Sequence, residues 1–346
     1  RSTLSSSSAA SDVYKRQEYH TLAKAGGLAD AVTALAQGLA TQGHSVDVVL
    51  PRYKNIDTEG FDRDERPLQV QLGTGVLGCA VHTGTIRGVR IHLIEHDALY
   101  RRDGIYGPAP DQSFQDNLLR FALLSRGALE VALLKGLNPQ IIHVHDWSSA
   151  LVPVYLRYSY ADTSLSTAST VLSIHNLAFQ GAVPIAEGLS VPGLSREVVE
   201  KAGLFHGDTI NLLKGGILTA DRIVAVSPTY AKEIQQPRYG YDLHTALQIR
   251  APHLEGILNG IDTTVWNPDT DPYIPARYNR EDMRGKRICK SRLQDDLDLT
   301  EDPDIPVVGM VTRLTRQKGI DELFDPDYGV AERILQELPL QWIVLG

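Results

Sequence analysis

Hydrophobic and polar positions follow a helical spacing and then a strand-like run in the first part of the chain. Val32, Leu35 and Leu39 recur at intervals that place them on one face of a helix. Gly43 follows this stretch as a helix-ending signal, and the short apolar run Val46–Leu50 comes next. The pattern therefore predicts an amphipathic helix followed by a buried strand.

The same succession of helix and strand continues along the chain. The predicted strands are Ile141–His145, Val171–His175, Ile223–Val226, Gly256–Asn259, Val307–Val311 and Trp342–Leu345. The predicted helices are Asp116–Leu134, Ala150–Tyr158 and the segments that follow Pro228 and Gly319. Strands that alternate with helices predict the α/β class, with doubly wound parallel sheets that bind ligands at the carboxyl ends of their strands.

The region Leu68–Glu95 has a different pattern. Its apolar residues alternate in short segments, and Arg87-Gly88 forms a turn signal, so we predict a β-meander. Gly73, Gly75 and Gly78 spell G-x-G-x-x-G within it, which would suggest a dinucleotide site. That fingerprint needs a helix directly after it, and the following residues alternate like a strand. We interpret these residues as hairpin glycines.

The length and the pattern predict a head and two domains. We place the head at residues 1–17, an N-terminal Rossmann-like catalytic domain at residues 18–255, and the start of a truncated C-terminal Rossmann-like domain at residues 256–346. The polar stretch Asn267–Arg284 is interpreted as a loop within the second domain.

The head is rich in Ser and has no hydrophobic periodicity. Its last residues, Asp12–Gln17, match the translated end of an adaptor used in sequencing libraries, whereas a transit peptide would also be Ser-rich and carry basic residues. We expect residues 1–17 to be artefactual or disordered and to pair with no strand. A strand formed by Val13–Gln17 beside Val46–Leu50 would contradict this expectation.

Composition narrows the class of protein. A net charge of −8 disfavours nucleic acid as the main partner, because phosphate backbones are bound by clustered Lys and Arg. No apolar run approaches the roughly 20 residues needed to cross a membrane. Cys79 and Cys289 lie far apart and have no metal-type spacing, which fits a reducing cytoplasm.

The loop Lys24–Leu28 opens the first predicted helix and contains Gly26 and Gly27. Backbone N–H groups at a helix start attract anions, and glycine lets a phosphate or a sugar approach closely. Taken alone, the loop favours a packing turn with a solvated Lys24.

The strand Ile141–His145 continues into Asp146 and Trp147. His143 and His145 share a face of the strand, so a metal pair is conceivable, but the sequence offers no third ligand and favours core histidines with satisfied hydrogen bonds. Trp147 provides a flat ring on which a sugar could stack, although tryptophan more often belongs to a core.

Two further loops follow predicted strands. His175-Asn176 comes after Val171–Ile174 and would suit the polar edge of a sugar, or equally a turn with a capping histidine. Arg313 and Lys318 follow Val307–Val311 in a loop that leads into a helix, so both could reach one diphosphate. A solvated basic loop is the alternative for this pair, and we favour the diphosphate site.

Six ordered motifs resemble those of the ADP-glucose-dependent glycogen and starch synthases. They are K-x-G-G-L at Lys24–Leu28, H-D-W at His145–Trp147, H-N-L-A-x-Q-G at His175–Gly181, V-S-P-T-Y-A-x-E-I at Val226–Ile234, G-I-L-N-G-I-D at Gly256–Asp262 and T-R-L-T-x-Q-K-G at Thr312–Gly319. The resemblance extends from Glu18 to about Leu323. The sequence of Trp266–Pro272 resembles the bacterial glycogen synthases more than the plant enzymes.

This resemblance implies the GT-B fold, in which two Rossmann-like domains face a cleft. It implies retaining transfer of glucose from ADP-glucose to the 4-hydroxyl of an α-glucan, without metal or cofactor. The implied catalytic residues are His175, Arg313, Lys318 and Lys24, of which Arg313 and Lys318 neutralise the leaving diphosphate. The implied substrate-binding residues are Gly26, Gly27, Asp30, Asp146, Trp147, Asn176 and Asn259, with Asn259 at the domain junction.

The sequence also departs from the family. The head stands where the family has an apolar strand, and Tyr239–Gln248 differs from the usual G-Y-G-L-x-G-V-L. The family has a Glu-containing F-E-P-C/S-G-L segment downstream of the last predicted strand, so we expect the chain by itself to transfer little glucose.

Three other interpretations remain open at this stage. A plastidial starch synthase is the alternative within the family, and a genuine transit peptide would favour it. A noncatalytic sugar-binding relative would share the motifs but lack the downstream Glu. A dehydrogenase is the weakest alternative, because it rests on the glycine pattern of the meander.

Overall fold

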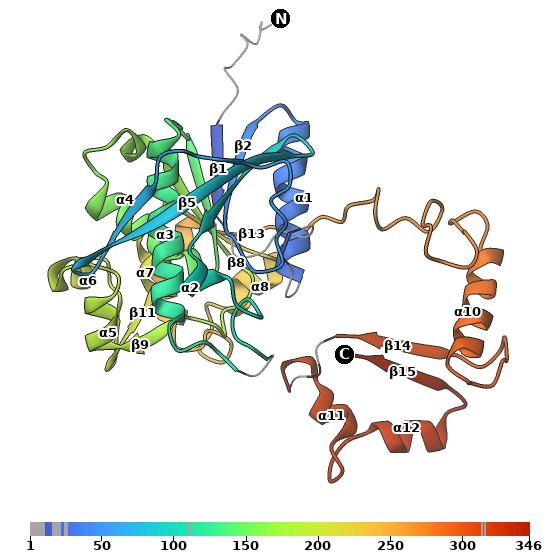
Figure 1. The fold of residues 1–346 in the computed structure, drawn as a ribbon. Helices are drawn as coiled ribbons and strands as arrows, with labels where there is room; N and C mark the ends of the chain where they lie inside the picture. Colours follow the sequence, from blue (N-terminus) through green and yellow to red (C-terminus); the bar gives the residue numbers. More distant parts are fainter. Residues whose placement is uncertain (1–10, 16–21, 24–26, 110–111, 313, 315) are drawn as a thin grey trace, which may run out of the picture. The chain divides into compact units, whose positions relative to one another are not determined.

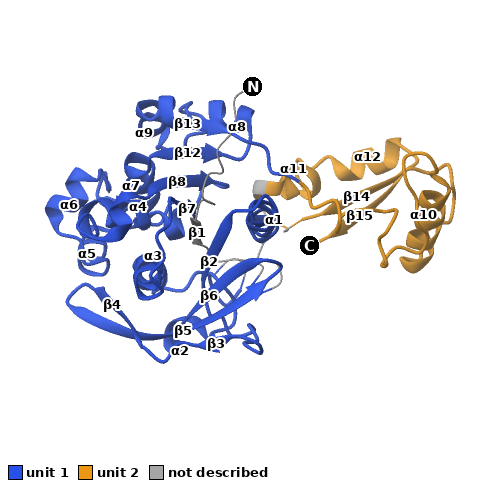
Figure 2. Ribbon diagram, turned by 90° about the horizontal axis from the view of Figure 1, so that it is seen from above, with its two compact units in different colours: residues 1–260 blue, residues 261–346 orange. Residues whose placement is uncertain are grey.

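The computed structural model describes residues 11–15, 22–23, 27–109, 112–312, 314 and 316–346. Of residues 11–15 and 317 it describes the backbone. The chain forms two compact units, Arg1–Gly260 (unit 1) and Ile261–Gly346 (unit 2), coloured separately in Figure 2. The units divide after Gly260, whereas the predicted boundary follows Glu255.

A ten-stranded sheet forms the centre of unit 1 (Figure 1). Its strands are β1 (Ser11–Lys15), β2 (Ser45–Pro51), β3 (Asp62–Arg63), β4 (Leu68–Leu72), β5 (Gly75–Ile86), β6 (Val89–Glu95), β7 (Ile141–His145), β8 (Ser169–Ile174), β12 (Arg222–Ala225) and β13 (Leu254–Gly256). The order is β13-β12-β8-β7-β1-β2-β6-β5-β3, with β4 paired to β5. A separate small sheet contains β9 (Ala182–Pro184), β10 (Phe205–His206) and β11 (Thr209–Asn211).

Helices cover both faces of this sheet, with α1 on one side in Figure 2 and α3, α4 and α7 on the other. Their bounds are α1 (Gly27–Thr41), α2 (Asp97–Tyr100), α3 (Asn117–Leu134), α4 (Leu151–Ser159), α5 (Ile185–Ser190), α6 (Arg196–Lys201), α7 (Leu212–Thr219), α8 (Pro228–Glu233) and α9 (His244–Ile249). Short 3-10 helices lie at η1 (Trp147–Ser149), η2 (Ser164–Thr167) and η3 (Ala251–His253). Among the described residues, no helix has both the length and the apolar character that a membrane span requires.

The topology creates a switch point between β1 and β7. From β1 the chain builds outward through β2 and β6 in one direction, and through β7, β8, β12 and β13 in the other. These strands are parallel to their neighbours, which confirms the predicted doubly wound arrangement. The carboxyl ends of β7 and β8 therefore lie beside the point where such sheets bind ligands.

The expectation that the head pairs with no strand is wrong. Ser11–Lys15 forms β1, which pairs in parallel with Ser45–Val49 of β2 on one side, and its residues Asp12–Lys15 pair with Ile141–Val144 of β7 on the other. The physical reason is that β2 and β7 each present backbone donors and acceptors toward this position, and a strand between them satisfies both rows. Residues 11–15 thus form a strand between β2 and β7.

The helices of unit 1 are more deeply buried than a simple amphipathic pattern suggests. On α1 the buried face consists of Ala29, Val32, Thr33 and Ala36, whereas Leu35 is exposed, contrary to the predicted face. Helix α3 is buried around most of its circumference, because it packs against the sheet and against α4. Its position makes it the central helix of the unit.

The meander is confirmed as β4, β5 and β6, which pair antiparallel. Arg87 and Gly88 have φ values of 48° and 80°, as a tight hairpin turn requires. Gly73 has a φ of 54° in the β4–β5 turn. The glycine pattern is therefore a hairpin and not a dinucleotide site.

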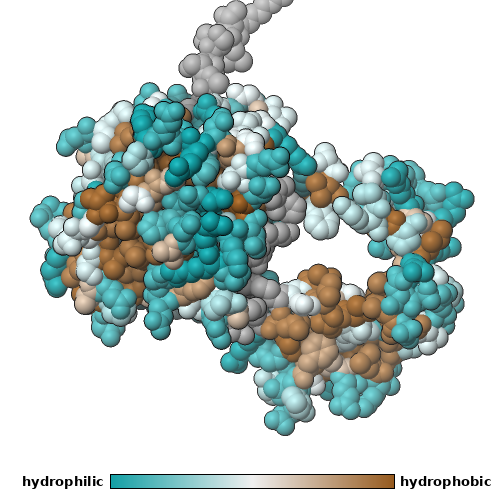
Figure 3. Space-filling model, viewed as in Figure 1, coloured by the Kyte–Doolittle hydropathy of each residue, from teal (hydrophilic) through white to brown (hydrophobic). Residues whose placement is uncertain are grey.

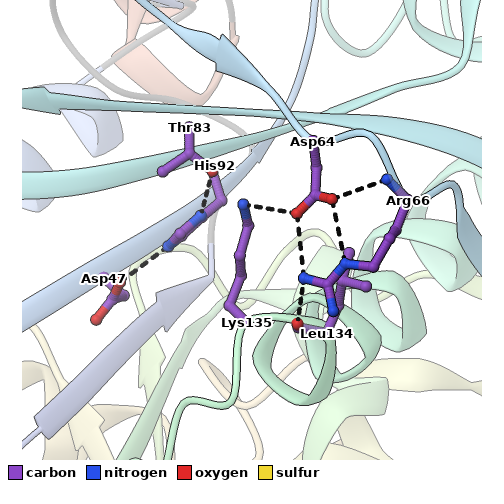
Figure 4. A network of polar contacts seen from close by, with 7 residues as sticks. All are labelled: Asp47, Asp64, Arg66, Thr83, His92, Leu134 and Lys135. Carbon is purple, nitrogen blue, oxygen red and sulfur yellow. Dashed lines mark hydrogen bonds and ion pairs between the residues drawn. The ribbon is translucent and has the colours of Figure 1, made fainter.

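Ion pairs tie this meander to the rest of unit 1 (Figure 4). Asp64, just after β3, accepts hydrogen bonds from the backbone N–H of Arg66 at 2.9 Å and is 2.9 Å from the ammonium of Lys135. Arg66 also donates to the carbonyl of Leu134, the last residue of α3, at 3.0 Å. The end of the central helix and the hairpin layer are thus held together by polar contacts.

The described residues of unit 2 form a two-stranded parallel sheet and three α-helices. These are β14 (Val307–Val311), β15 (Gln341–Leu345), α10 (Arg284–Asp296), α11 (Ile320–Phe324) and α12 (Ala331–Glu337), with the 3-10 helix η4 at Arg316–Lys318. Both strands and the helix after Gly319 were predicted, whereas α10 was not. The strand predicted at Gly256–Asn259 shares only Gly256 with β13 (Leu254–Gly256), and β13 belongs to the sheet of unit 1.

Candidate functional site

Asp146 organises the loops at the carboxyl ends of β7 and β8. Its backbone N–H donates to the carbonyl of Ser173 at 2.9 Å. Its carboxylate oxygen Oδ1 accepts from the backbone N–H groups of His175 at 2.8 Å and Asn176 at 3.2 Å. Asp146 has a φ of 52°, a strained value for a residue with a side chain, and such strain is concentrated at functional sites.

Three histidines lie side by side at this edge of the sheet. Nδ1 of His145 is 2.9 Å from Nε2 of His175, and the rings of His143 and His145 stack with their centroids 4.3 Å apart. Nε2 of His143 is 2.7 Å from Oγ of Ser173. The ring nitrogens named here have hydrogen-bond partners, as the interpretation of His143 and His145 as histidines with satisfied hydrogen bonds expects. His175 is held both through its ring and through its backbone.

The structure packs Trp147 against the core. Its indole meets the ring of Phe121 edge-on, with centroids 4.9 Å apart and planes at 90°. Gly181 covers it closely, since a Cβ at position 181 would lie 2.4 Å from Cε3 of the indole. Gly181 also has a φ of 62°, so glycine is required there for two reasons. Trp147 is half-buried, with its indole in contact with Phe121 and close to Gly181.

Gln180 and Tyr230 belong to the site and were not among the predicted site residues. Nε2 of Gln180 donates to the carbonyls of Leu177 at 3.2 Å and Tyr241 at 2.7 Å. Oε1 of Gln180 accepts from Nδ2 of the fully buried Asn211 at 2.5 Å. Both residues fall within recognised motifs, so motif membership was the signal that could have identified them.

Tyr230, in α8, contacts the loop that follows β8. Its hydroxyl accepts from the backbone N–H of Leu177 at 3.0 Å. Burial raises the pKa of Tyr230, and the negative charge of Asp146 raises it further. Tyr230 is therefore a neutral hydroxyl at the edge of the site.

The remaining predicted residues of unit 1 are less closely joined to this cluster. Gly27 is the exposed first residue of α1, and Asp30 is half-buried in its first turn. Asn259 is exposed in the segment after β13. Lys24 and Gly26 lie outside the described residues.

In unit 2, Lys318 is the exposed last residue of η4, directly before Gly319, which has a φ of 73°. Arg313 lies outside the described residues. Arg316, also in η4, pairs with Asp321 at 3.0 Å. In the part of unit 2 that the structure describes, Lys318 has no ion-pair partner and can accept an external anion.

The cluster in unit 1 suits a neutral, hydroxyl-rich ligand. Asp146, His175 and Asn176 come together at the switch point, with the hydroxyl of Tyr230 beside them. Across the described residues, no group of three or more His, Cys, Asp or Glu is arranged to hold a metal ion.

Comparison with known proteins agrees with this picture. Residues 16–249 match the model of the starch synthase catalytic domain. The chain is 40% identical over 326 residues to glycogen synthase of Treponema denticola, covering 94% of the chain and 66% of that protein. It is 43% identical over 331 residues to glycogen synthase 1 of Geobacter metallireducens, covering 94% of the chain and 64% of that protein.

Among solved structures, the chain resembles the catalytic domain of starch synthase IV from Arabidopsis thaliana bound to ADP and acarbose. The TM-score is 0.87 at 32% identity, covering 98% of this chain and 69% of that one. The chain thus spans slightly less than two thirds of the length of the first bacterial relatives.

Proposed function

The chain belongs to the starch synthase catalytic-domain family, and we propose that it is part of a glycogen synthase. The proposed reaction moves glucose from ADP-glucose to the 4-hydroxyl of a non-reducing α-1,4-glucan end with retention of configuration. The observation that carries this proposal is the Asp146-anchored loop of His175 and Asn176 beside the switch point. The names of the bacterial relatives and the ADP and acarbose bound to the Arabidopsis enzyme support it.

On the sugar side, unit 1 supplies fixed hydrogen-bonding groups. Asp146 holds the backbone of His175 and Asn176, and His145 fixes the ring of His175. We propose that His175 holds the transferred glucose, with Asn176 at its polar edge. Preorganised groups of this kind lower the barrier because little reorganisation is needed during the reaction.

On the donor side, the proposed cations are Arg313 and Lys318, with Lys24 and the amides of Gly26 and Gly27. They neutralise the charge that develops on the leaving ADP diphosphate, a stabilisation made mainly in the transition state. Asp30 and Asn259 are proposed as further substrate contacts, and Trp147 supports the loop from the core side. Fixed side-chain cations perform this task in the proposal, which requires no metal or other cofactor.

The architecture proposed for the whole enzyme is GT-B, with unit 1 as its N-terminal half and unit 2 belonging to the C-terminal half. The proposed compartment is the cytoplasm, where ADP-glucose and glycogen are the partners. Plastidial starch synthase is the alternative, and the similarity to the Arabidopsis starch synthase supports it.

Two measurements on the whole chain test this proposal. The first is maltohexaose binding by calorimetry, and the second is incorporation of radiolabelled glucose from ADP-glucose into glycogen, with UDP-glucose as the competing donor. Ala331 is the one buried hydrophobic side chain among the described residues of unit 2. Because the proposed donor cation Lys318 stands in this unit, we expect slow incorporation of glucose. Glucan binding, which the proposal assigns to unit 1, should be measurable. In Asp146→Asn, both decrease by about tenfold or more, because a charge-assisted acceptor for two N–H groups is weakened.

Arg292→Ala, at an exposed position of unit 2, is the matched control and should leave both readouts unchanged. The proposal is overturned if a folded protein shows neither binding nor incorporation that depends on Asp146. It is also overturned if UDP-glucose alone serves as donor.

A further inference from the structure

We propose that Phe179 and Tyr241 form an aromatic rim on the His175 site, on which glucose units of the bound α-glucan stack. The inference rests on the proposed function and assigns a binding role to two residues outside the recognised site. It starts from a discrepancy, because the ring that the sequence suggested for stacking, Trp147, is packed against Phe121 and Gly181. The loop that contains the site offers Phe179 to solvent, and a neighbouring segment offers Tyr241.

Phe179 and Tyr241 are exposed although they are large and apolar. The side chain of Phe179 is 53% exposed and that of Tyr241 is 55% exposed. Phe179 belongs to the same loop as His175 and Asn176, three residues beyond Asn176. Tyr241 lies in the segment between α8 and α9. Two aromatic rings exposed beside one polar site are typical of a ligand-binding surface. Their exposure to water costs free energy when no ligand covers them.

Direct contacts bring the segment of Tyr241 to the site loop. Nε2 of Gln180, the residue next to Phe179, donates to the carbonyl of Tyr241 at 2.7 Å. The same loop is also held by Tyr230, whose hydroxyl accepts from the backbone N–H of Leu177 at 3.0 Å. The two aromatic residues are therefore attached to one hydrogen-bonded frame, and the buried Asn211 anchors it.

The backbone at Tyr241 supports a functional reason for its exposure. Tyr241 and Asp242 have φ values of 42° and 64°, so two successive residues with side chains adopt the left-handed region. This conformation costs free energy, and proteins retain it mainly where a side chain must be aimed. Asp242 occupies the position of a glycine in the family pattern, which adds a carboxylate beside the ring.

The chemistry favours an α-glucan over a protein partner. Sugar sites combine an aromatic face, which covers the C–H side of a pyranose ring, with amide or carboxylate groups that bind its hydroxyls. Here the exposed rings of Phe179 and Tyr241 accompany Asn176 and Asp242, and together they continue the site that holds the terminal sugar. A protein interface would be expected to bury a larger apolar core than two rings.

The test compares glucan and nucleotide-sugar affinity in variants of the whole chain. Phe179→Ala and Tyr241→Ala should each weaken maltohexaose binding by about fivefold, the loss of one aromatic contact, while the affinity for ADP-glucose stays within about twofold. Phe179→Tyr and Tyr241→Phe keep a ring and should bind maltohexaose as the parent does. Ile249→Ala, which removes an apolar side chain that is 67% exposed on the same unit, is the matched control.

Thermal unfolding of each variant shows whether the fold is retained. If an alanine variant unfolds, Phe179→Leu or Tyr241→Leu, which keeps an apolar side chain but removes the ring, carries the test and should show the same loss of maltohexaose affinity. Unchanged maltohexaose affinity in both folded alanine variants overturns the rim and leaves the proposed function intact. Absence of maltohexaose binding in the parent protein contradicts the proposed function itself. Equal losses in Ile249→Ala would assign the effect to a general apolar surface and also overturn the rim.

Discussion

Unit 1 and unit 2 both place helices beside a parallel sheet, but they differ in how much apolar surface they bury. In the described part of the chain, every buried hydrophobic side chain except Ala331 belongs to unit 1. In unit 2 the strand residues Val311 and Leu345 are 81% and 61% exposed. Figure 3 shows the corresponding apolar surface of the C-terminal unit in brown.

This difference separates the two halves of the proposed chemistry. The sugar-binding groups of unit 1 stand on strands with a closed core, so their geometry is fixed before a ligand arrives. The loop of Lys318 stands on β14 and α11, whose side chains are mainly exposed or half-buried. We therefore expect substitutions in the core of unit 1 to lower stability, whereas substitutions in the Lys318 loop of unit 2 should affect mainly ligand binding.

The largest expected effect is at Arg120, a fully buried cation on α3. Its guanidinium donates to the carbonyls of Leu99 at 2.7 Å and Ile105 at 2.8 Å and to Oδ1 of Asn117 at 2.6 Å. Arg120→Ala leaves these acceptors unsatisfied and opens a cavity, so the free energy of unfolding of unit 1 should fall by about 4 kcal/mol. Urea denaturation followed by circular dichroism measures it, and a loss below about 1 kcal/mol would contradict the description of α3 as the central helix.

A matched pair of strand residues compares the two units directly. Leu172 in β8 is fully buried, whereas Leu345 in β15 is 61% exposed. Leu172→Ala should lower the unfolding free energy by about 3 kcal/mol, and Leu345→Ala by at most about 0.5 kcal/mol. Similar losses in the two variants, measured by urea denaturation, would remove the distinction between the units.

The third prediction concerns ligand binding by unit 2. Lys318→Ala should weaken ADP-glucose binding about tenfold or more, because a charge-assisted contact to the diphosphate is lost, without changing maltohexaose affinity or stability. Arg316→Ala should have a smaller effect, since Arg316 is already paired with Asp321 at 3.0 Å. Calorimetric titration of both ligands distinguishes these outcomes, and an equal loss in both variants would return the loop to a solvated basic surface.

The smallest expected effect is the acid sensitivity of unit 1. Burial raises the pKa of Asp47, but hydrogen bonds from His92 and Arg90 outweigh it and hold the net pKa below its usual value (Figure 4 shows the His92 contact). A depressed folded-state pKa gives stability that is present above the unfolded pKa, about 3.9, and is lost as the pH falls below it. Asp47→Asn should remove about 1 kcal/mol of this acid dependence.

Asp282 in unit 2 is the control for this acid effect. The Arg284 guanidinium lowers the pKa of Asp282 to about 2, yet the group is exposed. We expect Asp282→Asn to have no measurable effect on the pH dependence of stability, because solvent screens the pair. Urea midpoints at neutral and acid pH decide between the two sites.

Much of this organisation could be predicted from the sequence, and the failures have identifiable causes. The hydrophobic periodicity and the turn residues that end each apolar run located β7, β8, β12 and β14. Both are local signals in the sequence. The pairing of β1 was missed because it depends on backbone groups of distant strands, and the composition of the head gave no indication of it.

At the site, the residue pattern placed Asp146 and the pair His175-Asn176 directly after two predicted strands, and the family resemblance assigned them to the substrate. It could not predict that Trp147 packs against Phe121 and Gly181, since that contact joins segments far apart in the sequence. Nor could it predict the left-handed backbone of Asp146, which depends on tertiary hydrogen bonds.

The most direct test of the account is hydrogen exchange of the whole chain, measured by mass spectrometry with and without maltohexaose. The account predicts that amides of Ile142–Val144 and Leu172–Ile174 exchange orders of magnitude more slowly than those of Val307–Val311, since they open only with the core of unit 1. It further predicts that maltohexaose protects residues 175–181 and 239–242. Equal exchange in the two units, or no added protection in those two segments at saturating maltohexaose, would contradict a preformed glucan site in unit 1.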